Sequence, residues 1–187
     1  MDRRQRREPD RGVTAATNVV DPVRRLLGVG LVLVLGLALA SCSSGQDAAA
    51  VAALQKKADI ADIENIEVTW HQASSTKDVD LMMSIWAPDA TFTIGDTILQ
   101  GEDEIRQFFQ DEAAPFQAGN HWISETPAYK VEATVNGDTG TLYFECHYVD
   151  AKTGKVVAYV AADQDVARID GKWVITRLVA ATPELKP

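Results

Sequence analysis

The sequence predicts an α+β domain in which helices pack on one face of an antiparallel sheet. Two observations support this fold class. Apolar residues recur at spacings of three and four as far as Phe109, whereas after Asn120 they recur at every second position, so helices precede strands along the chain. Turn signals typical of hairpins separate the strand-like segments, and they are Asn136-Gly137, Thr153-Gly154 and Asp170-Gly171.

The chain opens with the features of an export signal. Arg24 and Arg25 close a basic segment, and the residues from Leu26 to Ala40 are all apolar or glycine. At a rise of about 1.5 Å per residue this run would extend about 22 Å as a helix, which is short of the roughly 30 Å hydrocarbon core. Residues 1–41 are therefore predicted to be a signal peptide, exported by either the general or the twin-arginine route.

The apolar run ends in Leu39-Ala40-Ser41-Cys42, which resembles the bacterial lipobox. The resemblance implies cleavage before Cys42 and attachment of two or three acyl chains there, which is enough for stable anchoring at a membrane surface. The protein is thus expected in the bacterial cell envelope, exported and lipid-anchored. An uncleaved anchor and an ordinary signal peptide are the alternatives.

Cleavage would leave one acidic domain on a tether. Residues 42–51 are rich in Ser, Gln and Ala and are predicted to be flexible, residues 52–182 form the domain, and residues 183–187 form a tail. Because the signal carries seven basic and four acidic side chains, its removal changes the net charge from −9 to −12. Such a surface repels nucleic acid, so no nucleic-acid partner is expected. With Cys42 acylated, Cys146 is the remaining thiol and is predicted to be buried and unreactive.

The first helix is predicted over residues 52–75. Its apolar positions recur at spacings of three and four with acidic residues between them, and they are Ile60, Ile63, Ile66, Trp70 and Ala73. Trp70 and His71 point about 100° apart on a helix, so only one is expected to face the core. We expect Trp70 to point inward and His71 toward solvent.

Two further helices follow. Asp78 is predicted to cap a short second helix that Pro88 closes, with its apolar positions at Val79, Met82, Met83 and Trp86. Gly101 opens a third helix, whose acidic first turn suits the positive end of the helix dipole. The buried stripe of this third helix is predicted to consist of Ile105, Phe108 and Phe109.

Six strand-like segments are predicted. Two short ones flank the turn Gly95-Asp96, and four longer ones follow the last helix. The six segments are residues 90–94, 97–99, 121–135, 139–150, 155–169 and 172–181. Pro127 lies inside the third of these and implies a bulge or an edge position, because proline cannot donate to the ladder.

The order of these elements, together with three short phrases, resembles the SnoaL-like and nuclear transport factor 2-like (NTF2-like) superfamily. The phrases are Trp86-Ala87-Pro88-Asp89-Ala90-Thr91-Phe92, Leu99-Gln100-Gly101 before Glu104-Ile105-Arg106-Gln107-Phe108-Phe109, and Asp170-Gly171-Lys172-Trp173-Val174-Ile175. The resemblance covers about residues 55–180. It implies a cone-shaped fold, with three N-terminal helices packed on a curved antiparallel sheet around a cavity open at one end. Because the superfamily includes isomerases, dehydratases, ligand binders and protein interfaces, the fold leaves the function open.

Several catalytic positions of the superfamily are replaced here. The resemblance places Ile94 where ketosteroid isomerase has its aspartate base, and Ala162 where it has its oxyanion-hole aspartate. Neither can act as an acid or base, unless Asp96 or Asp163 serves through a shifted register. The Tyr-Asp pair of scytalone dehydratase-like members is replaced by Ser74-Ser75, although His121 coincides with a cavity histidine of such proteins.

The remaining acid/base candidates are His121, Glu145 and Asp163. Tyr143, Glu145 and His147 share one face of a strand, and the other face is more apolar, with Leu142, Phe144, Cys146 and Tyr148. We expect the apolar set to face the core, which leaves Glu145 in solvent. The alternative is that Glu145 and His147 join His121 in a small catalytic pocket. Asp163 and Asp165 share a face of the next strand, as an acidic rim or as a paired site.

No metal or cofactor is expected. His121, Glu145 and His147 are ligand types, but their spacing matches neither a structural nor a catalytic zinc site. Aromatic walls are what an apolar cavity of this fold requires. The candidate pocket residues are Trp70, Trp86, Phe92, His121, Tyr143 and Tyr159.

These observations favour a non-catalytic, membrane-anchored lipoprotein whose domain binds a small apolar ligand or a protein partner. The alternative is a SnoaL-like lyase or isomerase that uses His121 as acid/base on a hydrophobic substrate, assisted by Glu145 or Asp163. A third hypothesis is an assembly module, because many members of the superfamily form homodimers through the outer face of the sheet.

Overall fold

A computed structural model describes residues 43–124 and 128–181. The chain divides between Ser41 and Cys42 into two units, and all described residues belong to the second. The predicted signal peptide, the lipidated Cys42, Pro127 and the C-terminal tail lie outside the described residues.

The helices and strands follow the predicted order. The helical elements are α1 (Ser43–Thr76), α2 (Val79–Met83), α3 (Gly101–Asp111) and the 3₁₀ turn η1 (Ala114–Phe116). The strands are β1 (Trp86–Ile94), β2 (Thr97–Gln100), β3 (Trp122–Ser124), β4 (Lys130–Asn136), β5 (Thr139–Asp150), β6 (Lys155–Ile169) and β7 (Lys172–Ala181). The Asp78 carboxylate accepts a hydrogen bond from Leu81 N at 2.9 Å and so caps α2 as predicted. Trp86, which was expected to end the apolar series of this helix, begins β1 instead.

The sheet is mixed rather than purely antiparallel. The strand order is β2-β1-β7-β6-β5, and β3 and β4 both pair with the far edge of β5. Every pair is antiparallel except β1 and β7, which run parallel. The predicted fold class is confirmed, and the parallel pair is possible because β1 and β7 are joined by a long connection rather than a hairpin.

The predicted strand over residues 121–135 is two strands. Ser124 of β3 pairs with Tyr148, and Lys130 of β4 pairs with Glu145 nearer the other end of the same neighbour. The interruption contains Pro127, which has no N–H for the ladder. The predicted bounds of β5, β6 and β7 agree with the structure, since a glycine-containing turn separates each from the next.

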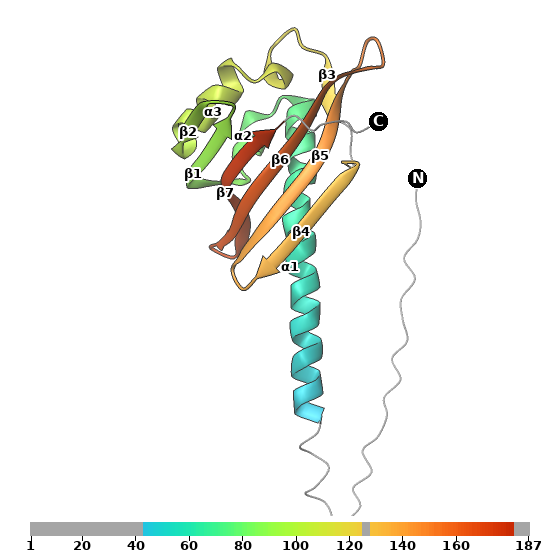
Figure 1. The fold of residues 1–187 in the computed structure, drawn as a ribbon, viewed down its shortest axis with the longest axis vertical. Helices are drawn as coiled ribbons and strands as arrows, with labels where there is room; N and C mark the ends of the chain where they lie inside the picture. Colours follow the sequence, from blue (N-terminus) through green and yellow to red (C-terminus); the bar gives the residue numbers. More distant parts are fainter. Residues whose placement is uncertain (1–42, 125–127, 182–187) are drawn as a thin grey trace, which may run out of the picture. The chain divides into compact units, whose positions relative to one another are not determined.

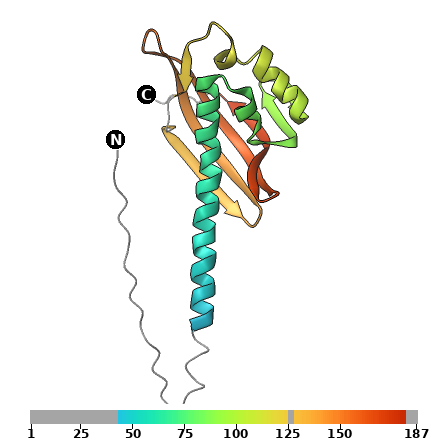
Figure 2. The same cartoon turned by 180° about the vertical axis from the view of Figure 1, so that it is seen from behind.

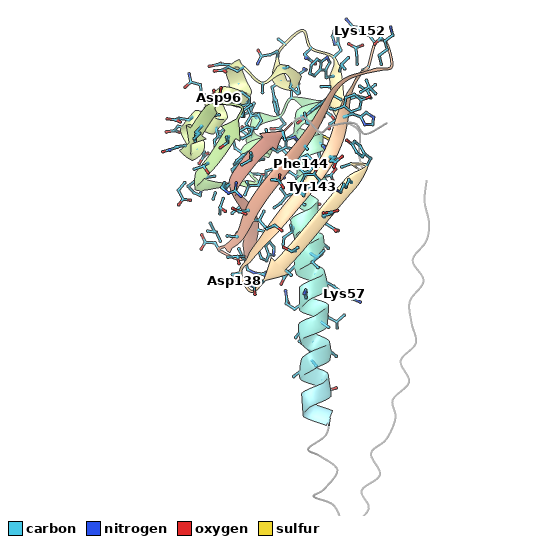
Figure 3. The ribbon with its side chains drawn as sticks, in the orientation of Figure 1. Lys57, Asp96, Asp138, Tyr143, Phe144 and Lys152 are labelled. Carbon is cyan, nitrogen blue, oxygen red and sulfur yellow. The ribbon has the colours of Figure 1, made fainter. Side chains whose placement is uncertain are left out.

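The core lies between α1 and one face of the curved sheet (Figures 1 and 2). Ile63, Ile66, Trp70 and Ala73 of α1 are buried, as the helical spacing predicts. On β5 the apolar set faces this core, whereas Tyr143, a neighbour of Phe144 in Figure 3, lies on the other face. The prediction that Leu142, Phe144, Cys146 and Tyr148 point inward is therefore confirmed.

The N-terminal part of α1 extends beyond the sheet (Figure 1). The prediction of a flexible tether over residues 42–51 is wrong for the described part, because α1 already begins at Ser43. Five alanines between Ala48 and Ala53 have the highest helix propensity, which outweighs the polar composition that suggested flexibility. Within residues 43–124 and 128–181, no helix combines the length and apolarity that crossing a bilayer demands.

Candidate functional site

A cavity of about 200 Å³ lies between α1, the segment α3-η1 and the inner face of the sheet. Aromatic side chains form most of its wall. They are Trp70, Phe92, Phe108, Phe109, Phe116, Trp122, Phe144 and Tyr148. Small residues of β6 and β7 complete the wall, and they are Ala158, Ala161, Ala162 and Ala180.

The fold explains why this space is open. Phe144 pairs with Ala162 across β5 and β6, and Ala162 pairs in turn with Ala180 on β7. Large side chains on one strand therefore face small ones on the next two strands, and the void remains above the alanines. Trp70 on α1 closes the other side, with its ring centroid 5.6 Å from Phe109 and 6.0 Å from Phe144.

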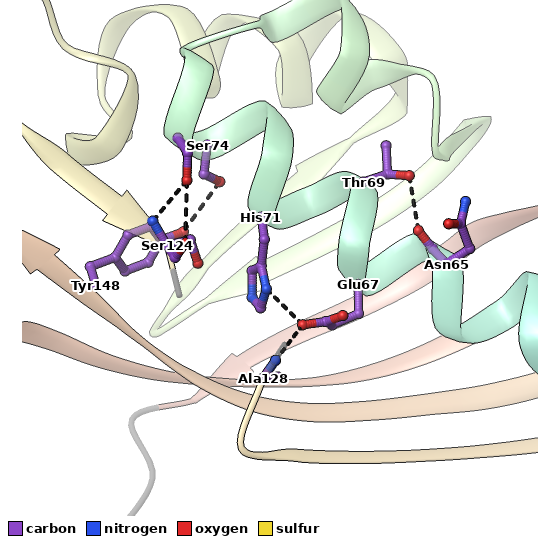
Figure 4. A network of polar contacts seen from close by, with 9 residues as sticks. Asn65, Glu67, Thr69, His71, Ser74, Ser124, Ala128 and Tyr148 are labelled. Atoms are coloured by element: carbon purple, nitrogen blue, oxygen red, sulfur yellow. Dashed lines mark hydrogen bonds and ion pairs between the residues drawn. The ribbon is translucent and has the colours of Figure 1, made fainter. Parts of the chain in front are cut away.

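Two of the side chains that line this apolar cavity carry a hydroxyl group, and they are Ser74 and Tyr148. The Tyr148 hydroxyl donates to Ser74 Oγ at 3.3 Å, which joins β5 to α1 (Figure 4). Burial raises the pKa of Tyr148 to about 12. Tyr148 therefore stays neutral near pH 7 and keeps its hydrogen available for donation.

The sequence-derived pocket candidates are divided between the two faces of the sheet. Trp70 and Phe92 line the cavity, whereas Trp86 is buried behind them, 5.3 Å from the Phe92 ring. Tyr143 and Tyr159 lie on the outer face of the sheet, opposite Asp163 and His147 respectively. His121 precedes β3, is exposed, and does not line the cavity.

The structure does not bring the three acid/base candidates together in the cavity. Glu145 lies on the outer face, where it accepts a 2.6 Å hydrogen bond from the Tyr143 hydroxyl. This bond, with Lys130 Nζ 3.5 Å away, lowers the pKa of Glu145 and holds it ionised. The same bond raises the pKa of Tyr143 to about 12. Asp163 is exposed on the same face, so neither carboxylate reaches a molecule inside the cavity.

The expectation that His71 faces solvent is wrong. His71 is fully buried, and its Nδ1 lies 2.6 Å from Glu67 Oε1 one turn earlier on α1 (Figure 4). Glu67 also accepts a 2.8 Å hydrogen bond from Ala128 N, ahead of β4. The pair was not predicted because Glu67 is one of the acidic residues between the apolar positions of the helix, although its four-residue spacing to His71 is the signal that could have found it. Neither residue lines the cavity.

Within the two described ranges, no three His, Cys, Asp or Glu side chains converge as metal ligands. Ser74, Phe109 and Tyr148 line the pocket although the sequence did not predict this. Their part in the wall depends on how α1, α3 and β5 meet, which no single segment encodes.

The chain belongs to the SnoaL-like family, because the SnoaL-like domain matches residues 55–179. No curated protein matches the chain. An NTF2-like protein with a cystatin-like fold from Novosphingobium aromaticivorans is similar in structure, with a TM-score of 0.62 and 15% identity over 78% of this chain and 94% of that one. An NTF2-like protein from Pseudomonas putida has a TM-score of 0.59 and 15% identity over 70% and 98% of the two chains.

A candidate dehydratase of the NTF2-like family from Streptomyces avermitilis is a third similar structure. Its TM-score is 0.55 and its identity 16%, over 68% of this chain and 97% of that one. At such identities the likeness concerns the fold, which is NTF2-like, and the family includes both ligand-binding and enzymatic members.

Proposed function

We propose that this domain binds a small apolar molecule in the cavity, without catalysing a reaction, and that a lipid on Cys42 anchors it at the bacterial envelope. The proposal of binding without catalysis rests on which chemical groups line the cavity. None of the described residues that line the cavity bears a carboxylate, an imidazole or an amine. General acid/base catalysis requires such a group within hydrogen-bond reach of the proton that moves.

The volume limits the size of the ligand. An apolar cavity of about 150 Å³ in another protein holds benzene, so about 200 Å³ suits a molecule of one or two small rings. Burial of the ligand's apolar surface supplies the main driving force, at about 25 cal/mol per Å². The fixed aromatic walls add shape selection, because their rings pack against one another as well as lining the space.

The proposed anchor is supported by the sequence, and its position suits the fold. Cys42 immediately precedes α1, and every described side chain from Asp47 to Ala58 is exposed. A helix that begins beside the acylated residue would act as a stiff spacer between the membrane surface and the cavity.

Binding is tested with indane, a two-ring hydrocarbon, on the unit Cys42–Pro187 carrying Cys42→Ser. This unit contains the whole described core. Calorimetry is expected to show saturable binding of one indane per chain. Ala180→Leu fills the cavity and should abolish binding, whereas the same change at Ala167, which does not line the cavity, should leave it intact. Absence of binding, or equal binding by both variants, contradicts the proposal.

The catalytic alternative and the anchor have separate tests. Turnover of a hydrophobic substrate by dehydration or isomerisation, abolished by His121→Ala, would replace the non-catalytic proposal with the enzymatic one. For the anchor, full-length protein expressed in bacteria should incorporate labelled palmitate and sediment with membranes. Cys42→Ala should lose both properties, and retention of both would disprove the lipid anchor.

A further inference from the structure

The cavity contains one polar feature that an entirely hydrocarbon ligand would leave unused. Trp70 lines the cavity and is nine-tenths buried, yet its indole Nε1 has no hydrogen-bond partner among the described residues. An indole N–H is a donor only, and a buried donor without an acceptor costs free energy. Native structures rarely keep such a group unless a ligand or water satisfies it.

Tyr148 supplies a second polar group to the cavity wall that contains the unpaired Trp70 N–H. Tyr148 lines the same cavity, and burial raises its pKa against weaker opposing side-chain interactions with Ser74, Trp70 and Ser124. The Tyr148 hydroxyl donates to Ser74 Oγ over a long 3.3 Å, and Ser74 lies one turn after Trp70 on α1, so Tyr148 Oη lies on the side of the helix that carries Trp70. Ser124 Oγ is also buried and without a partner in the described part of the chain. Trp70, Ser74 and Tyr148 therefore place their polar groups on one part of a largely apolar wall.

We infer that the ligand carries a single hydrogen-bond-accepting oxygen, which binds between Trp70 Nε1 and the Tyr148 hydroxyl while its apolar ring body occupies the aromatic cavity. This inference rests on the proposed function and narrows the class of ligand. An accepting oxygen satisfies the indole N–H, and rotation of the Tyr148 hydroxyl supplies the second donor. The wall near this point offers no charged group, so a neutral oxygen fits and a carboxylate does not.

The test compares two probes of nearly equal shape, indane and 1-indanone, on the unit Cys42–Pro187 with Cys42→Ser. The ketone should bind more tightly, by about five- to tenfold, because it satisfies a buried donor that indane leaves unpaired. In a ¹H–¹⁵N spectrum, the indole N–H signal of Trp70, assigned from its loss in Trp70→Phe, should move downfield with 1-indanone and stay near its free position with indane.

Variants separate hydrogen bonding from shape. Trp70→Phe and Tyr148→Phe should each remove most of the preference for 1-indanone over indane, whatever each does to the affinity for indane itself. Phe108→Leu changes the wall away from this donor pair, at a ring that packs on Phe92 and Phe109, and should weaken both probes equally. The Trp70 indole signal is read in the unmodified pocket, so the test does not depend on the folding of Tyr148→Phe.

The outcomes distinguish the inference from the function on which it rests. If neither probe binds, the cavity is not a ligand site and the proposed function fails. If both bind with equal affinity and the Trp70 signal is unmoved by 1-indanone, ligand binding stands and the accepting-oxygen site is wrong. A preference for the ketone that persists in both Trp70→Phe and Tyr148→Phe also overturns the inference.

Discussion

Glu67 Oε1 lies 2.6 Å from His71 Nδ1 in the core of the domain, and both side chains are almost completely buried. The same carboxylate oxygen accepts the Ala128 N–H at 2.8 Å, so one group on α1 serves both its own helix and the chain entering β4. Removing one partner of such a buried pair is costly, because the other partner is left without its hydrogen bond.

Glu67→Ala should therefore lower the free energy of unfolding by about 2 kcal/mol or more, since it deprives both His71 and the Ala128 N–H of their acceptor. Urea unfolding followed by circular dichroism measures the change. Glu64→Ala, at an exposed position on the same helix, is the matched control and should stay within about 0.5 kcal/mol of the parent protein. Equal effects of the two substitutions would show that the buried pair does not stabilise the fold.

The burial of Glu67 and His71 could not be predicted from the sequence of α1 alone. The spacing of Ile63, Ile66 and Trp70 gives the direction of the buried face, and the structure agrees. It does not give the width of the buried arc, which depends on what packs on either side of the helix. Because β4 and β5 approach beside Trp70, His71 and Ser74 are buried as well.

Acid should weaken the domain in part through Asp59. Arg168 Nη2 lies 2.5 Å from Asp59 Oδ1, and this hydrogen bond lowers the pKa of Asp59 from its ordinary value of 3.8 against the opposing effect of burial. Because the folded pKa is the lower one, the stabilisation is complete above pH 3.8 and is lost as the pH falls through the folded value.

Asp59→Asn should accordingly reduce the loss in free energy of unfolding that occurs below about pH 4. Asp62→Asn, at an exposed site one turn further along α1, should leave this loss unchanged. Urea midpoints of the three proteins, measured between neutral pH and the acid limit of folding, give the comparison. If Asp59→Asn loses as much free energy of unfolding at low pH as the parent protein, Asp59 has the same pKa in the folded and unfolded states.

Cys146 should be inert while the protein is folded. Its side chain is 1% exposed, and burial raises the pKa of the thiol to about 12, so almost no reactive thiolate is present near pH 8. In the Cys42→Ser background, a disulfide reagent should modify Cys146 only through transient opening, and rapidly once urea unfolds the chain. Ser84→Cys supplies an exposed thiol as a positive control. Rapid modification of folded Cys146 would contradict its burial.

The sequence predicted more of the fold than of the candidate site. Alternation along β5 identified its inner face, and the glycine turns gave the bounds of β5, β6 and β7. The parallel pairing of β1 with β7 has no local signal, because it is made between segments that are far apart in the sequence. The cavity is non-local in the same way, since it exists where Ala162 and Ala180 align opposite Phe144.

Gly140 shows how closely α1 approaches the sheet. It lies in β5, opposite Val135 on β4 and Val166 on β6. A Cβ at this position would overlap the backbone oxygen of Thr134 and stand 3.1 Å from Ile63 Cδ1 on α1. Backbone cannot move aside as a flexible side chain can, so the extra methyl group must separate β4 from β5 or lift the helix.

Gly140→Ala is therefore expected to destabilise the domain by about 1–3 kcal/mol, although alanine suits a strand better than glycine does. Gly119→Ala is the matched control, because a Cβ there meets nothing within 4 Å and its φ is ordinary, so its effect should be close to neutral or slightly stabilising. Urea unfolding of both variants tests the contrast. If Gly140→Ala proves as harmless as Gly119→Ala, α1 does not rest on β5 at Ile63, and the helix would no longer be held over the sheet as the cavity requires.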